Sequence, residues 1–214
     1  MRTKEQIDGI LSALEREYPD AECTLDERDA WRLLVQVRLA AQCTDARVNL
    51  VTPALFERFP TVEAMAAADV GEVEEYIRSC GFYHAKARDI VWQAQRLCEV
   101  YGGRVPDNMD DLLTLPGVGR KSANLILGDV FHQSGAVVVD THCIRLSNRL
   151  GLVDGDKDPV RIEKTLRAVL PPEKTNGFCH RLVLHGRAVC TARKPMCDQC
   201  CVRHVCHAVE EADA

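Results

Sequence analysis

One lysine of the sequence stands where its amine could act as a nucleophile. Lys121 ends the run Leu115-Pro116-Gly117-Val118-Gly119-Arg120-Lys121. A helix is expected to begin at about Arg120, and the positive end of its dipole disfavours a charged amine in the first turn. A neutral lysine amine forms Schiff bases with carbonyl-like carbons. An ordinary surface lysine is the alternative interpretation of this position.

The turn in front of Lys121 is suited to binding an anion. Pro116 is expected to end the preceding helix. Gly117 and Gly119 carry no side chain, so their backbone N–H groups can approach a ligand closely. The free N–H groups and the dipole of the next helix face the same point, and on DNA the anion there would be a phosphate. A plain interhelical turn with a glycine C-cap explains the same residues.

A carboxylate follows the apolar run Val137-Val138-Val139 directly. Asp140 is a natural N-cap for the helix that is expected to follow. The same carboxylate could stabilise positive charge at a sugar carbon and assist proton transfer, as in glycoside hydrolysis, and the two roles can coexist. His142 is expected to pack or to contact a phosphate rather than to bind a metal.

Four cysteines with a metal-binding spacing lie near the C-terminal end, in the pattern Cys190-x6-Cys197-x2-Cys200-x5-Cys206. Compact sets with an x2 pair bind soft metals as thiolates, and both zinc and an iron–sulfur cluster fit such a set. Cys201 breaks the spacing and is expected to be a bystander. A bound metal would hold the loop that carries Arg193 and Lys194, which would present two positive charges.

The composition is that of an ordinary globular protein, with 214 residues, 46% hydrophobic and 28% charged. No apolar run suggests a membrane span or a secretory signal, which favours an intracellular, cytoplasmic protein. The net charge is −5, yet residues 111–206 carry an excess of lysine and arginine, which suits a local phosphate-binding face. Most of the seven remaining cysteines are expected in the core, because a disulfide scaffold is improbable without an export signal.

The elements that must position these residues are helical almost throughout. Helix signals are a capping box at residues 3–6, an apolar stretch from Trp31 to Ala41, a cap at Thr61 and a second capping box at residues 69–72, whose helix should stop at Gly81. They continue with apolar periodicity over 85–100 and a helix–turn–helix over 108–131. The run at residues 137–139 is too short and solitary for a sheet, so it is expected to be a buried extended connection.

Taken together, these residues resemble the endonuclease III family. The landmarks occur in order over nearly the whole chain: Ala41-Gln42-Cys43-Thr44-Asp45, Gly81-Phe82-Tyr83, Leu115 to Lys121, Val139-Asp140-Thr141-His142, His185-Gly186-Arg187 and the four cysteines. The cysteine spacing matches that family's [4Fe–4S] site, which moves the choice of metal from zinc to iron–sulfur.

The resemblance implies an all-α, two-lobed helix-hairpin-helix DNA glycosylase fold with a DNA-binding cleft between the lobes. One lobe, residues 23–134, would be a six-helix barrel with the hairpin. The other would combine residues 1–22 and 135–214 into a discontinuous domain that holds the cluster. The expected partner is double-stranded DNA with damaged bases or abasic sites, bound by a monomer that associates with the nucleoid through DNA.

The resemblance also implies a mechanism. Lys121 would attack C1′ of a flipped-out nucleotide, release an oxidised pyrimidine and cut the strand 3′ to the site by β-elimination, with Asp140 supporting the developing positive charge. Gln42 would fill the space of the flipped base, and Phe82 stands where the family usually has a leucine wedge. The expected DNA contacts are Gln42, Asp45, Phe82, Gly117, Gly119, His142, Arg145, Arg187, Arg193 and Lys194.

Two other functions fit parts of the same pattern. A monofunctional mismatch thymine or uracil glycosylase would release a base without a covalent intermediate. A non-catalytic DNA-binding module would use the hairpin alone, but it would need neither Lys121 nor Asp140. The related adenine-removing glycosylases lack the hairpin lysine and carry an extra C-terminal domain, so Lys121 favours the bifunctional enzyme.

Overall fold

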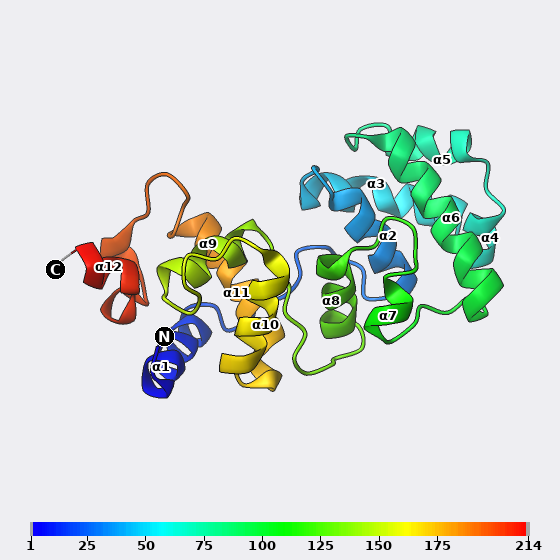
Figure 1. Cartoon of the computed structure of the whole chain (residues 1–214). Helices are drawn as coiled ribbons and strands as arrows, with labels where there is room; N and C mark the ends of the chain where they lie inside the picture. The colour runs from blue at the N-terminus through cyan, green and yellow to red at the C-terminus, as the bar shows by residue number, and fades with distance from the viewer. Residues whose placement is uncertain (1, 213–214) are drawn as a thin grey trace. The chain divides into compact units, whose positions relative to one another are not determined.

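The computed structural model describes residues 2–212, and within them the chain forms helices and no β-strand (Figure 1). The α-helices are α1 (Lys4–Glu17), α2 (Ala30–Ala40), α3 (Asp45–Arg58), α4 (Val62–Ala66), α5 (Val70–Ile77), α6 (Tyr83–Tyr101), α7 (Met109–Leu112), α8 (Arg120–Asp129), α9 (Thr141–Arg149), α10 (Pro159–Val169), α11 (Thr175–Ala188) and α12 (His207–Ala212). Short 3-10 turns are η1 (Pro172–Lys174), η2 (Cys197–Gln199) and η3 (Arg203–Val205). None of the described helices combines the length and apolar character needed to cross a bilayer.

The helices form two compact units. Residues 24–132 form one unit, which we call the hairpin unit because it contains α7, α8 and the turn between them. The residues up to Cys23 and those from Gln133 onward form the other, called here the cysteine unit. The cysteine unit is therefore assembled from two stretches of sequence.

In the hairpin unit, long α6 packs against α4 and α5, and α2 packs against α3, α6 and α8 (Figure 1). Helix α2 is buried along most of its length because Leu33, Leu34, Val35 and Leu39 are shielded from solvent. Full burial of one such side chain contributes about 1.5–3 kcal/mol. Helix α2 is thus the central element against which the hairpin helix α8 is held.

In the cysteine unit, α11 packs against α1 and α9, and α1 also contacts η3. The apolar stripe of α1 predicted from its period, Ile7, Ile10, Leu11 and Leu14, is buried. The stretch Val137–Val139 is buried without forming a strand, as expected, and leads into α9. The start of the chain thereby contributes to the core of a unit that otherwise comes from its second half.

Local capping signals predicted the helix starts well. Thr3 and Gln6 form the reciprocal capping box, and the side chains of Thr61 and Asp69 cap α4 and α5. The second predicted box is incomplete, because Glu72 is engaged by Arg58 at 2.6 Å.

Three sequence expectations need correction. Helix α5 ends at Ile77 rather than at Gly81, and α7 ends at Leu112, so Pro116 lies in the turn and does not terminate the helix. Of the seven cysteines outside the quartet, only Cys80, Cys143 and Cys179 are buried. The remaining four are partly exposed because they lie in turns, in connections or at helix surfaces: Cys23, Cys43, Cys98 and Cys201.

Candidate active site and cysteine cavity

Helix α8 begins without a side-chain cap. Its N-cap is Gly119, with φ −107° and no side chain to accept the first N–H groups of the helix. Lys121 follows in the first turn and is exposed, and no hydrogen bond or ion pair to another described residue holds its ammonium. An uncapped helix start leaves N–H donors for an anion. The geometry therefore places an accessible amine beside a potential phosphate site.

An ion pair that the sequence did not reveal packs against the hairpin turn. Arg38 on α2 pairs with Asp89 on α6 at 2.7 Å. A Cβ at Gly117, where φ is +74°, would lie 2.7 Å from Cδ and Nε of Arg38. Gln93 donates to the carbonyl of Pro116 at 3.1 Å. Gly117 is required here both for its left-handed backbone and for the close approach of Arg38.

Asp140 caps α9, as predicted. Its Oδ1 accepts a hydrogen bond from the backbone N–H of Cys143 at 2.7 Å, and the residue itself is half-buried. The buried run Val137–Val139 fixes the backbone that enters the cap. One carboxylate oxygen is therefore committed to the helix, which holds the other in a defined direction.

Three exposed residues of the hairpin unit that carry side chains adopt left-handed backbone conformations: Gln42, Phe82 and, at the end of the unit, His132. Gln42 has φ 54° and Phe82 has φ 59°, both unusual for residues with side chains. Phe82 is 68% exposed although it is a large aromatic residue. The backbones around Gln42 and Phe82 are close, because a Cβ on Gly81 would lie 3.6 Å from the carbonyl oxygen of Gln42. Strain and apolar exposure in the same place indicate a functional surface.

Asp45, expected at the DNA surface, has an internal role as well. It lies in the first turn of α3 and accepts a hydrogen bond from the hydroxyl of Thr24 at 2.5 Å. A carboxylate at a helix N-terminus is favourable, so Asp45 also stabilises the start of α3.

In the cysteine unit, His142 and Arg145 on α9 pack against α11. Arg145 donates to His142 Nδ1 at 3.1 Å and to the carbonyls of Gly186 and Cys190 at 3.1 and 3.0 Å. A Cβ at Gly186 would collide with His142, which explains a glycine at this crossing. Arg187 is exposed in the last turn of α11, where a cation is favourable.

The four predicted cysteines line one cavity of about 140 Å³, together with Arg149, Val189, Pro195, Met196, Ala208 and Val209. Cys201, the expected bystander, is not among the lining residues. Among residues 2–212, no three His, Cys, Asp or Glu side chains converge closely enough to hold one metal ion. The four thiols therefore share one lined space. Burial raises the pKa of Cys200 to about 11 and also raises the pKa of Cys206.

Arg149 anchors the segment that begins at the first cysteine. Its guanidinium lies 3.2 Å from Cys190 Sγ and donates to the carbonyls of Thr191 and Ala192 at 2.8 and 3.0 Å. The loop that carries exposed Arg193 and Lys194 therefore starts from a fixed point. Arg149 follows Arg145 by four residues, and this helical spacing was the one available sequence signal.

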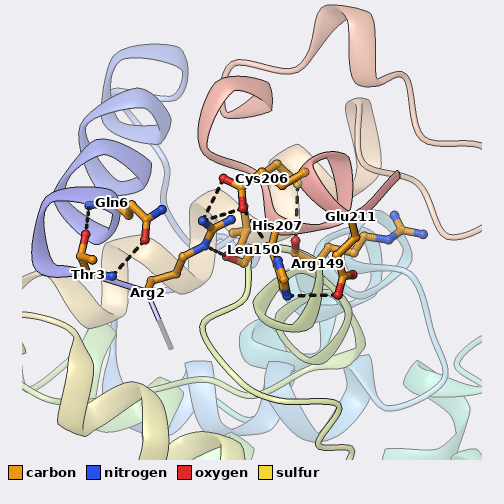
Figure 2. Close-up of polar contacts among 9 residues, drawn as sticks. Arg2, Thr3, Gln6, Arg149, Leu150, Cys206, His207 and Glu211 are labelled. Carbon is orange, nitrogen blue, oxygen red and sulfur yellow. Dashed lines mark hydrogen bonds and ion pairs between the residues drawn. The ribbon is translucent and has the colours of Figure 1, made fainter. Parts of the chain in front are cut away.

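Arg2, at the start of the chain, contacts two segments that lie near the last cysteine (Figure 2). Arg2 donates to the carbonyl of Leu150 at 2.9 Å and pairs with Glu210 of α12 at 2.9 Å. Cys206 Sγ lies 3.4 Å from the carbonyl oxygen of Arg149. These contacts connect α1, the end of α9 and α12 around one edge of the cavity.

A chain of polar contacts connects Cys200 to Tyr18 through His185 on α11. Tyr18 lies 3.1 Å from His185 Nδ1, and His185 Nε2 lies 3.3 Å from Cys200 Sγ. Burial raises the pKa of Tyr18 to about 12 and lowers the pKa of His185. The tyrosine hydroxyl and the two imidazole nitrogens thus form a continuous chain of polar contacts that ends at Cys200 Sγ.

Comparison with known proteins connects these features. Residues 35–172 match the HhH-GPD superfamily of base excision DNA repair proteins. Endonuclease III of Synechocystis sp. is 47% identical over 203 residues, which cover 95% of this chain and 92% of its own. Endonuclease III of Bacillus subtilis is 38% identical and covers 100% of this chain and 97% of its own. This chain belongs to the endonuclease III family.

A solved structure agrees with that assignment. The trapped covalent intermediate of an endonuclease III with DNA, in an estranged-adenine complex, superposes with a TM-score of 0.91 at 41% identity and covers 100% of both chains. The expected helix-hairpin-helix glycosylase fold is thereby confirmed. As a member of the endonuclease III family, the chain is a base excision repair DNA glycosylase with abasic-site lyase activity, and its partner is DNA.

Proposed function

We propose that this endonuclease III homologue removes oxidised pyrimidines from duplex DNA and cleaves 3′ to the abasic site through a Schiff base on Lys121. The observation that carries the proposal is the position of Lys121, an exposed amine in the first turn of a helix that starts without a cap. A nucleophilic lysine needs access to its substrate, and Lys121 is exposed at the helix start where a phosphate would bind.

In the proposed reaction, Lys121 Nζ attacks C1′ of the damaged nucleotide and the bond from C1′ to the base breaks. The departing base takes up a proton, and the sugar opens to an imine on the lysine. Loss of a C2′ proton then expels the 3′ phosphate by β-elimination. We assign Asp140 to stabilising the positive charge that develops at C1′, since its capping bond keeps the carboxylate oriented.

The proposed DNA contacts divide into three kinds. The N–H groups beside Gly117 and Gly119 bind a phosphate, as uncapped helix starts do. Gln42 and Phe82, whose backbones are both left-handed, enter the duplex, where an apolar side chain can wedge between bases. Phosphate-facing and supporting residues complete the set: Asp45, His142, Arg145, Arg187, Arg193 and Lys194. A monomer suffices for this set, and binding of damaged or abasic duplex DNA would keep the enzyme at the nucleoid.

The cysteine cavity fits a [4Fe–4S] cluster held by Cys190, Cys197, Cys200 and Cys206. Each thiolate of such a cluster binds a different iron, so the sulfurs surround a volume, whereas zinc requires all four about 2.3 Å from one point. The cavity of about 140 Å³ is about ten times what one water needs. When bound, the cluster supplies four iron–thiolate bonds that hold the loop bearing Arg193 and Lys194 in place.

The cluster assignment is tested by a matched pair of neighbouring cysteines. Cys197→Ser should lose iron and weaken DNA binding, because it removes one of the thiolates that line the cavity. Cys201→Ser should keep its iron and its visible absorbance, since Cys201 does not line the cavity. Iron content and absorbance are the measurements; equal iron in both variants would refute the ligand assignment.

The proposed activity is tested by borohydride trapping on duplexes that carry an oxidised pyrimidine or an abasic site. The wild-type protein should form a covalent complex, and Lys121→Gln should form none. Lys164→Gln, an exposed lysine on α10, is the control and should trap like the wild type. Normal trapping by Lys121→Gln would exclude the assigned role. Base release from a G·T or uracil duplex without any trapping would instead indicate a monofunctional thymine or uracil glycosylase.

A further inference from the structure

Two cysteines of the hairpin unit lie directly beside two strained turns. Cys43 follows Gln42 in the turn after α2, and Cys80 precedes Gly81 and Phe82 in the turn before α6. We propose that Cys43 and Cys80 are a redox-active dithiol, which a small-molecule disulfide oxidises to an intramolecular disulfide that weakens DNA binding. The oxidation requires only these two cysteines, whereas the effect on DNA binding rests on the proposed function of Gln42 and Phe82.

The pair is already in contact. The Cys43 thiol is close enough to Cys80 to raise the pKa of the Cys80 thiol. Next to them, the carbonyl oxygen of Gln42 lies 3.6 Å from where a Cβ on Gly81 would stand. Each cysteine N–H bonds back to the helix before it, that of Cys43 to Ala40 at 3.1 Å and that of Cys80 to Ile77 at 2.8 Å. Both cysteines are thus at fixed positions in short turns, and a bond between them needs no large rearrangement of the chain.

The two thiols differ in access, which assigns their roles. Cys43 is partly exposed, whereas Cys80 is fully buried. Burial is also the largest cause that raises the pKa of Cys80, to about 11. Cys43 is therefore the thiol that meets an external oxidant first, and Cys80 is the resolving thiol that reacts second.

A buried lysine adds positive charge beside the pair. Lys86 on α6 is shielded from solvent and donates to the carbonyl of Leu39 at 2.8 Å. Its charge, and that of Arg47, favours a thiolate at Cys80 and so opposes the effect of burial. A nearby cation stabilises the thiolate through which exchange proceeds. The environment of the dithiol therefore contains a group that assists its second step.

The chemistry balances with a disulfide such as oxidised glutathione as the oxidant. The Cys43 thiol loses its proton, and its sulfur attacks one sulfur of glutathione disulfide and expels the first glutathione thiolate. The Cys80 sulfur then attacks Cys43 Sγ, loses its own proton and expels the second glutathione. The protein loses two hydrogen atoms and two electrons, and one glutathione disulfide becomes two glutathione thiols.

The bond would move the two turns relative to one another. A disulfide holds its sulfurs about 2.0 Å apart, closer than thiols that are not bonded to one another. Gln42 is adjacent to one cysteine and Phe82 is two residues from the other, so a covalent link between the cysteines constrains both turns. Displacements of about 1 Å at a functional site can cost as much as about hundredfold in activity. The disulfide is thus expected to pull both residues away from the positions in which they enter the duplex.

A second thiol pair serves as an internal control. Cys143 and Cys179, in the cysteine unit, also interact through their thiols. Both are buried, and hydrogen bonding to Cys143 followed by burial raises the pKa of Cys179 well above its usual value. Contact between thiols is therefore common to both pairs, and access to solvent is what distinguishes them. We expect the Cys143–Cys179 pair to remain reduced.

The test is anaerobic titration of the iron-loaded protein with oxidised and reduced glutathione, followed by alkylation and peptide mass mapping. The expected product links Cys43 to Cys80, is absent from Cys43→Ser and Cys80→Ser, and disappears on treatment with a dithiol reductant. A Cys43–glutathione adduct that never resolves, or no reaction at all, would overturn the dithiol. Cross-linking of Cys143 to Cys179 under the same conditions would refute solvent access as the selecting factor.

Binding to an abasic duplex is then measured for each form. The oxidised wild type should bind at least about tenfold more weakly than the reduced protein, and Cys43→Ser should be unaffected by the oxidant. Unchanged binding by a protein shown to carry the disulfide would overturn the effect on DNA. Failure of the reduced wild type to bind would count against the proposed function and leave the dithiol chemistry standing.

Discussion

The two helices that carry the proposed catalytic residues begin in opposite ways. Helix α8 begins at Gly119, with no side chain to accept its first N–H groups, and Lys121 lies just inside it. Helix α9 begins at Asp140, whose carboxylate accepts from the N–H of Cys143 at 2.7 Å. The first N–H groups of α8 are left free to bind a ligand, whereas those of α9 are capped by the side chain of its own N-cap residue. The difference shows how one fold prepares an anion site at one helix and a fixed carboxylate at another.

The largest effect is expected where capping and catalysis are combined in one residue. Asp140→Asn keeps a good N-cap but removes the charge, so the glycosylase rate should fall at least about hundredfold with stability nearly unchanged. Asp140→Ala should lose activity similarly and also lose about 1 kcal/mol of unfolding free energy. Single-turnover base release and denaturant unfolding separate the two roles. An active Asp140→Asn protein would show that Asp140 acts as a cap alone.

An intermediate effect is expected when the open helix start is closed. Gly119→Asp places a carboxylate where the next N–H groups can be capped, and no heavy atom lies within 4 Å of the new Cβ. Stability should rise by a few tenths of a kcal/mol, while duplex affinity should fall about tenfold through competition and repulsion of phosphate.

Gly119→Asn is the matched control for that change, because it caps the helix without adding charge. It should weaken binding by a smaller factor, about threefold, since only the competition for N–H groups remains. Salt titration of both variants measures the charge contribution. Wild-type affinity in both variants would mean that this helix start does not contact phosphate.

The last effect concerns the neighbouring glycine and is expected in stability. Gly117→Ala must adopt φ +74° with its Cβ 2.7 Å from Arg38, so we expect a loss of about 2 kcal/mol. Gly119→Ala, at φ −107° with open space around it, should change stability by less than about 0.5 kcal/mol. Thermal unfolding of the two variants measures this difference in stability. Equal stabilities would contradict the close packing of Arg38 under the turn.

Features of this molecule that depend on residues three or four apart could be predicted from the sequence. The caps at Thr3, Thr61 and Asp140 are of this kind, and so is the start of α8 at Arg120. Helix ends were predicted less well, because they depend on distant partners. The capping box at the start of α5 also depends on a distant partner, because Glu72 is engaged by Arg58 and does not complete it. The spacing of the four cysteines identified their cavity because their positions are close along the chain.

The supporting residues of the site could not be predicted in this way. Arg38 and Asp89 are 51 residues apart, and Tyr18 and His185 are 167 apart, so no local pattern connects them. The same holds for Cys43 and Cys80, whose proximity no local pattern indicated. Their contact follows from how α2 and α6 pack and becomes visible only when the fold is known.

The divided cysteine unit has a consequence for the order of events during synthesis. Helix α1 packs against α11, which follows it by more than 150 residues, whereas the hairpin unit is continuous. At about 5–20 residues per second, α1 leaves the ribosome on the order of ten to thirty seconds before its partner. During that interval its apolar stripe has no α11 to pack against; the stripe consists of Ile7, Ile10, Leu11 and Leu14. A nascent chain would therefore complete its hairpin unit while this helix is still free to engage a chaperone.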